Sequence, residues 1–128
     1  MIIDLVQTTL DNALYDLGIY SFWQKKEKFK ILDEYIVYTQ NADNEEFFAD
    51  DYVDIKAADI TIRYYYKSSF LDSKDGRKRI RDVGSIIINA LKNAGFEVPY
   101  GQFDAGDIEG TGYYATIFEC NYWRVADG

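Results

Sequence analysis

Hydrophobic residues recur every three or four positions in two segments of the chain. In the first segment, residues 3–17, they are Ile3, Val6, Leu10, Leu14 and Leu17. In the second, residues 73–94, they are Ile80, Val83, Ile87, Ala90, Leu91 and Ala94. This spacing places the apolar side chains on one face of a helix, so it predicts two amphipathic helices. Gly18 and Gly95 are typical helix ends, and Asp72 or Ser73 can cap the second helix.

Three further segments are rich in β-branched and aromatic residues, which favour strands. They are residues 18–23, 35–40 and 52–67. In the longest of them, Val53 and Ile55 occupy odd positions, whereas the apolar residues from Ile60 onward occupy even positions. One extra residue near 56–58 would return both halves to the same face of a sheet, so a β-bulge or bend is predicted there.

The remaining segments read as connections and a terminal hairpin. Residues 41–51 are polar and acidic and are expected to connect two strands. The hairpin has arms at 96–103 and 113–125 around a Gly-rich acidic loop, and Pro99 suggests an edge strand or an irregular start. The order predicts one α+β domain over residues 1–128, with two helices packed on a mainly antiparallel, twisted sheet of four to five strands.

The charge of the chain is concentrated in one window. The chain has 22 Asp and Glu against 14 Lys and Arg, a net charge of −8. Residues 32–59 contain nine acids and one base, so this acidic window carries the whole net charge and the rest of the chain is neutral. Binding to a phosphate backbone requires a basic surface, so this distribution argues against nucleic-acid binding as the main task.

The composition indicates the class of protein and the cellular compartment. A hydrophobic content of 48% and an aromatic content of 17% support a packed core. The N-terminal residues have no basic segment typical of a secretory signal, and no apolar run reaches the roughly 18 residues that span a bilayer. One cysteine excludes a disulfide within the chain, which is consistent with a reducing cytoplasm.

The residues that usually carry catalysis are scarce. The chain has no His, which excludes Ser-His and Cys-His nucleophile systems and imidazole metal sites. Cys120 lies within a predicted strand and is interpreted as a small packed residue. The glycines of the 104–112 loop do not form a phosphate-binding motif, because acids stand among them. No catalytic residue and no cofactor is predicted.

The acidic window also invites a calcium-site interpretation. Asn41, Asp43 and Glu45 match the first three ligand positions of a calcium loop. Glu46 stands where the turn glycine is required, and Tyr52 where the closing bidentate Glu should be. The match fails at its two most informative positions, so no metal site is predicted.

The predicted second helix begins with a basic run, residues 74–81. Bases near a helix N-terminus oppose the helix dipole, which suggests another partner for them. The run is either a solvated helix end, a contact for the acidic window of a neighbouring subunit or, least favoured by the net charge, a nucleic-acid contact. The residues proposed for a subunit interface or a lumen are Asp43, Glu45, Glu46, Asp50, Asp51, Arg77, Lys78 and Arg81.

The order of these segments resembles the small tail-terminator (tail-completion, head–tail joining) proteins of long-tailed phages and prophages. The resemblance rests on a short N-terminal helix, the strand at 34–38, the acidic segment at 42–44, the strand at 60–65, and the helix end at 91–96 before an aromatic strand. The chain departs from the usual pattern in its longer stretch before Tyr35 and its Gly-rich loop at 104–112.

The resemblance implies a structural virion protein of the tail or neck, assembled in the cytoplasm of a bacterial host. Such proteins form a ring, commonly of six copies, that caps the tail tube, ends its polymerisation and joins it to the head connector. Its partners would be copies of itself, the tail tube protein and the connector protein, without a membrane, and DNA would only pass through the lumen.

Two roles for the charged segments are compatible with that picture. The acidic window and the basic helix start could be the two halves of a heterologous subunit contact. Alternatively, the acidic window could line the lumen and repel passing DNA. Outside this family, the alternatives are a soluble acidic binding module such as a DNA mimic, another neck protein such as a head-closure component, and a small hydrolase that uses carboxylates.

Overall fold

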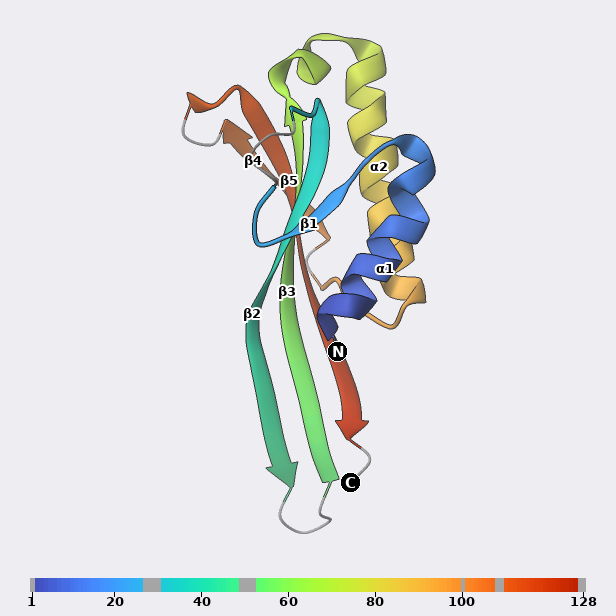
Figure 1. Ribbon diagram of the computed structural model, residues 1–128, viewed down its shortest axis with the longest axis vertical. Coiled ribbons are helices and arrows are strands. Elements are labelled where there is room, and N and C mark those ends of the chain that lie inside the picture. Colours follow the sequence, from blue (N-terminus) through green and yellow to red (C-terminus); the bar gives the residue numbers. More distant parts are fainter. Residues whose placement is uncertain (1, 27–30, 49–52, 100, 108–109, 127–128) are drawn as a thin grey trace.

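The structure is a computed structural model that describes residues 2–26, 31–48, 53–99, 101–107 and 110–126 (Figure 1). For residues 42–48, 53–57 and 123–126 it describes the backbone alone. Within these ranges, no helix is long and apolar enough to cross a membrane.

Both predicted helices are present. Helix α1 spans Ile2–Leu14 and continues into a short 3₁₀ turn, η1, at Tyr15–Leu17. Helix α2 spans Lys74–Asn93, after a 3₁₀ turn, η2, at Ser68–Asp72. Ser73 caps α2, because its Oγ accepts a hydrogen bond of 2.9 Å from the backbone N–H of Gly76.

The sheet has five strands in the order β1-β2-β3-β5-β4. Their bounds are β1 Ser21–Trp23, β2 Glu34–Phe48, β3 Val53–Lys67, β4 Gln102–Asp107 and β5 Tyr113–Ala126. The short β1 pairs with β2 in parallel, and all other neighbours are antiparallel. The α+β class with two helices and a mainly antiparallel sheet is thereby confirmed.

The hydrophobic core lies between the sheet and the two helices, which cover one face of the sheet (Figure 1). Even-numbered residues of β3 point to this face, as their burial shows for Ile60, Ile62, Tyr64 and Tyr66. The apolar stripes of the helices face them. The buried apolar side chains of the helices are Ile3, Val6, Leu10, Leu14, Val83, Ile87 and Leu91.

The acidic stretch predicted as a connection is mostly strand. Strand β2 continues through Phe48, and its residues 42–48 pair with residues 53–59 of β3. Acidic residues and Asn have low intrinsic β-propensity, but β3, which is rich in β-formers from Ile60 onward, continues beside them and supplies the backbone partners. The prediction of a connection is therefore wrong for residues 41–48, and its remaining residues, 49–51, lie outside the described residues.

The predicted β-bulge is on the neighbouring strand. The pairing of β3 with β5 is continuous from Asp54 to Lys67, so β3 has no extra residue at 56–58. The register shift lies in β2 between Gln40 and Ala42, which makes Asn41 the extra residue. The prediction of an irregularity in β3 is therefore wrong, because β3 changes its hydrophobic phase without an extra residue.

The terminal hairpin is also displaced from its predicted bounds. Residues 104–107, predicted as loop, belong to β4, whereas the segment before β4 makes one isolated bridge, between Glu97 and Asn121. Strand β4 lies at the edge of the sheet, as Pro99 suggested. The glycine and acidic residues at 104–107 indicate a loop by composition, but pairing with β5 holds these residues in a strand.

Three strands extend well beyond the helices at one end of the molecule (Figure 1). We call this extension the arm and define it as residues 42–48 of β2, 53–59 of β3 and 121–126 of β5. It begins at the bulge, where Ala42, Asp59 and Asn121 are aligned across the three strands. The arm is the most distinctive feature of the shape.

Candidate assembly surfaces

The arm carries most of the acidic window. Asp43, Glu45 and Glu46 lie on its β2 strand, and two further acids, Asp54 and Asp59, lie on its β3 strand. Because residues 41–46 are extended, they do not form the loop that a calcium site of the predicted kind requires. The candidates Asp50 and Asp51 lie outside the described residues.

One acid of the window is not available at the surface. Glu34, at the start of β2, is 13% exposed and forms an ion pair with Arg79 of α2, with 2.6 Å between Oε1 and Nη2. The hydroxyl of Tyr64 donates to the other carboxylate oxygen at 2.5 Å, and Arg79 also donates to the carbonyl of Leu17 at 3.0 Å. The hydrogen bond with Glu34 raises the pKa of Arg79, and burial raises that of Tyr64. This network joins both helical segments to the sheet.

The basic start of α2 is exposed and partly paired within its own chain. Lys78 forms an ion pair of 2.5 Å with Asp82, one helical turn later. Arg77 donates to the carbonyl of Leu71 at 2.8 Å. Arg77 and Arg81 line one wall of a groove of about 500 Å³ between α2 and the β4–β5 hairpin, with Asp104 in its lining.

The two charged surfaces do not meet within one chain. The first turns of α2 lie at the end of the molecule opposite to the arm tip, as Figure 1 shows. The charge pattern predicts Arg77, Lys78 and Arg81 as one half of a contact and the acidic window, with Asp43, Glu45 and Glu46, as the other. Such a contact would require a second copy of the chain.

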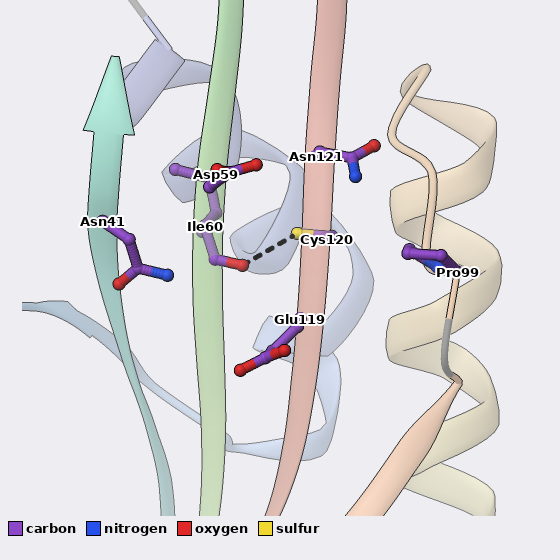
Figure 2. Close-up of a pocket in the computed structure, with 7 residues that line it drawn as sticks. All are labelled: Asn41, Asp59, Ile60, Pro99, Glu119, Cys120 and Asn121. Atoms are coloured by element: carbon purple, nitrogen blue, oxygen red, sulfur yellow. Dashed lines mark hydrogen bonds between the residues drawn. The ribbon is translucent and has the colours of Figure 1, made fainter. Parts of the chain in front are cut away.

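A polar pocket of about 240 Å³ lies at the base of the arm (Figure 2). Asn41, the bulge residue, donates from Nδ2 to the hydroxyl of Thr61 at 2.6 Å. Cys120 is buried and its thiol donates to the carbonyl of Ile60 at 3.5 Å, drawn as a dashed line in Figure 2. The residues that line the pocket are Asn41, Asp59, Ile60, Pro99, Glu119, Cys120 and Asn121.

The chemistry of this pocket does not favour a nucleophile. Burial raises the pKa of the Cys120 thiol to about 12, so the thiolate, which is the reactive form, is scarce near neutral pH. The structure agrees with the interpretation of Cys120 as a packed residue. Among the described residues, no group of three or more His, Cys, Asp and Glu side chains is arranged to hold a metal ion.

A cluster of tyrosines lies on the sheet face opposite the helices. The rings of Tyr35 and Tyr65, on adjacent strands, stack with centroids 5.0 Å apart, and Tyr113 meets Tyr35 edge-on at 5.6 Å. The ammonium group of Lys26 lies 5.6 Å from the centroid of the Tyr35 ring. Together with neighbouring residues they line a shallow pocket of about 390 Å³. Aromatic side chains are enriched at the core of protein–protein interfaces.

Sequence reasoning missed both the Glu34–Arg79 pair and the tyrosine cluster. The cluster could be predicted only from a strand register that places Tyr35 opposite Tyr65. That register depends on the position of the bulge in β2, which the sequence does not indicate. The pairing of Glu34 with Arg79 joins residues 45 positions apart and leaves no periodic signal in the sequence. No known protein family and no curated protein matches this chain.

Proposed function

We propose that this chain is a non-enzymatic structural protein of the tail-terminator type. It would close as a ring on the end of a phage tail tube, end the polymerisation of the tube and provide a face for the head connector. The observation that carries the proposal is the arm, which extends the sheet beyond the helices and bears the acidic residues. The helices do not extend along it (Figure 1), so the arm suits contact with other subunits.

The position of the charges supports one of the two roles considered for the acidic window. The arm and the basic start of α2 lie at opposite ends of the long axis of the molecule (Figure 1). In a ring whose axis follows this long axis, the arm of one copy and the basic start of α2 in the next copy lie at different heights, so they do not meet. We therefore favour acidic arms that surround the lumen, where their charge repels the phosphates of passing DNA.

Tube assembly in the presence of the chain tests the proposed function. A phage tail tube protein would be polymerised with and without the chain, and tube lengths measured by electron microscopy. We expect shorter tubes with a ring of density at one end. Tubes of unchanged length with bare ends would contradict the proposal, and binding to an unrelated DNA-binding protein would instead favour the acidic-module alternative.

A further inference from the structure

We propose that neighbouring copies join through their arms, the outer edge of β2 in one copy pairing with the outer edge of β5 in the next. Repeated around an axis, this contact would unite the arms into one closed sheet. The ring form of this inference rests on the proposed function, whereas the pairing itself rests on two strand edges.

The first edge belongs to β2. Strand β1 pairs with β2 only from Ile36 to Tyr38, and the last bond between these segments runs from the N–H of Gln24 to the carbonyl of Tyr38 at 2.9 Å. From Thr39 to Phe48, none of the described residues pairs with the outer side of β2. Strand edges with unpaired N–H and C=O groups are templates for another strand.

The second edge belongs to β5, on the opposite side of the same arm. Its last outer partner among the described residues is Glu97, which exchanges two hydrogen bonds of 2.8 and 2.9 Å with Asn121. Beyond Asn121, residues 122–126 pair with β3 on their inner side, and no described residue pairs with their outer side. Among the described parts of the chain, the arm therefore has one unpaired edge on each flank, at the same height along the molecule.

The hydrogen-bonding groups that these edges offer can be identified residue by residue. Backbone groups of successive strand residues alternate in direction, and before the bulge the even-numbered residues of β2 bond to β1. The extra residue at the bulge reverses this parity, so Asp43, Glu45 and Phe47 direct their N–H and C=O groups outward. On β5, Asn121 bonds outward, and Trp123 and Val125 follow the same parity.

Charge and strand direction identify a second copy of the chain as the occupant. Pairing of two β2 edges would set Asp43, Glu45 and Glu46 against like charges, which destabilises neighbouring strands. The β5 segment 122–126 contains Arg124 and no acid, so it is the compatible edge. Both strands are antiparallel to β3 and run toward the arm tip, so copies related by rotation about the long axis would pair them in parallel.

Proline substitutions test this pairing, because proline lacks the N–H group and is tolerated at strand edges. Glu45→Pro removes an outward N–H from β2, and Val125→Pro removes one from β5. Asp104→Pro is the matched control, since it also removes one acid and one outward N–H, but on β4, away from the arm. Glu45→Gln controls for the lost charge.

Oligomer mass would be measured by native mass spectrometry and analytical ultracentrifugation, with circular dichroism as the check of folding. We expect Glu45→Pro and Val125→Pro to weaken self-association by about tenfold or more, while Asp104→Pro and Glu45→Gln match the wild type. If Glu45→Pro does not fold, Asp43→Pro carries the same expectation.

Mixing gives the sharpest outcome. Glu45→Pro retains an intact β5 edge and Val125→Pro an intact β2 edge, so together they should form a one-to-one dimer and nothing larger. A wild type that stays monomeric, or proline variants that form assemblies of wild-type mass, would overturn the strand pairing. If the proline variants form assemblies of wild-type mass, the proposed function still stands. Wild-type rings that leave tube ends uncapped would overturn the proposed function alone.

Discussion

Glu34 shows how one residue can change the interpretation of a charged segment. By sequence it belongs to the acidic window, yet its carboxylate is mostly buried and receives hydrogen bonds from Arg79 and Tyr64. Its negative charge is paired with Arg79 within the fold. On the arm, by contrast, five acids of the window lie with its one base, Lys56, which is opposite Glu45 in the pairing of β2 with β3.

Removing Arg79 should therefore cost more than removing a neighbouring base of the same helix. Arg79→Met leaves the buried carboxylate of Glu34 without its cation, and we expect the free energy of unfolding to fall by about 2 kcal/mol. Lys78→Met is the matched control, because its pair with Asp82 is solvent-exposed, and a loss below about 0.5 kcal/mol is expected. Urea denaturation measures both, and equal losses would show that the Glu34 network adds no special stability.

At the scale of elements, α2 contains two glycines whose surroundings differ. A Cβ atom on Gly76 would lie 2.1 Å from the carbonyl oxygen of Phe70, which belongs to the backbone of η2. A Cβ atom on Gly84 would meet only the end of the Gln102 side chain, at 2.3 Å, and that exposed side chain can turn away. The first glycine therefore lets η2 fold back against the helix.

Alanine substitution should separate these two positions. Gly76→Ala forces a backbone shift and should lower the free energy of unfolding by about 2 kcal/mol. Gly84→Ala should leave stability unchanged or raise it by up to about 1 kcal/mol, because alanine favours the helix. Thermal and urea unfolding of both variants test this, and a shift in the same direction for both would contradict the packing described here.

Helices and strands with a clear hydrophobic periodicity could be predicted from the sequence. Strand segments that depend on pairing with a neighbouring strand could not. The stripes of α1 and α2 and the β-rich residues of β3 specify their structure locally. The extension of β2 past Gln40, the bulge at Asn41 and the strand at Asp104 depend on pairing with distant residues, which leaves no local signal. For the same reason, the separation of Arg77, Lys78 and Arg81 from the arm could not be read from charge spacing.

At the scale of the whole molecule, that separation leads to a prediction about assembly. Reversal of the basic helix start, Arg77→Glu with Lys78→Glu and Arg81→Glu, should leave self-association unchanged at low salt if the arms hold the copies together. The stability of the monomer should stay within about 1 kcal/mol of the wild type, since acids near a helix N-terminus are favourable. Sedimentation at low ionic strength measures the association, where unscreened charges act most strongly. Dissociation of the variant would indicate that this helix end does contact an acidic arm.

The single extra residue at Asn41 also divides the outer edge of β2 into two parts whose hydrogen-bonding positions are out of step. Even-numbered residues bond outward before it, and odd-numbered residues after it. A strand that follows β1 along residues 36–40 is one residue out of step with residues 43–47, so it would need a bulge of its own to continue. The polypeptide thus cannot readily occupy its own arm by lengthening β1. Deletion of Asn41 would make the outward-bonding positions of β2 alternate without a break, while Ala42 stays opposite Asp59 and the later pairs are unchanged, so a longer β1 could then cover this edge.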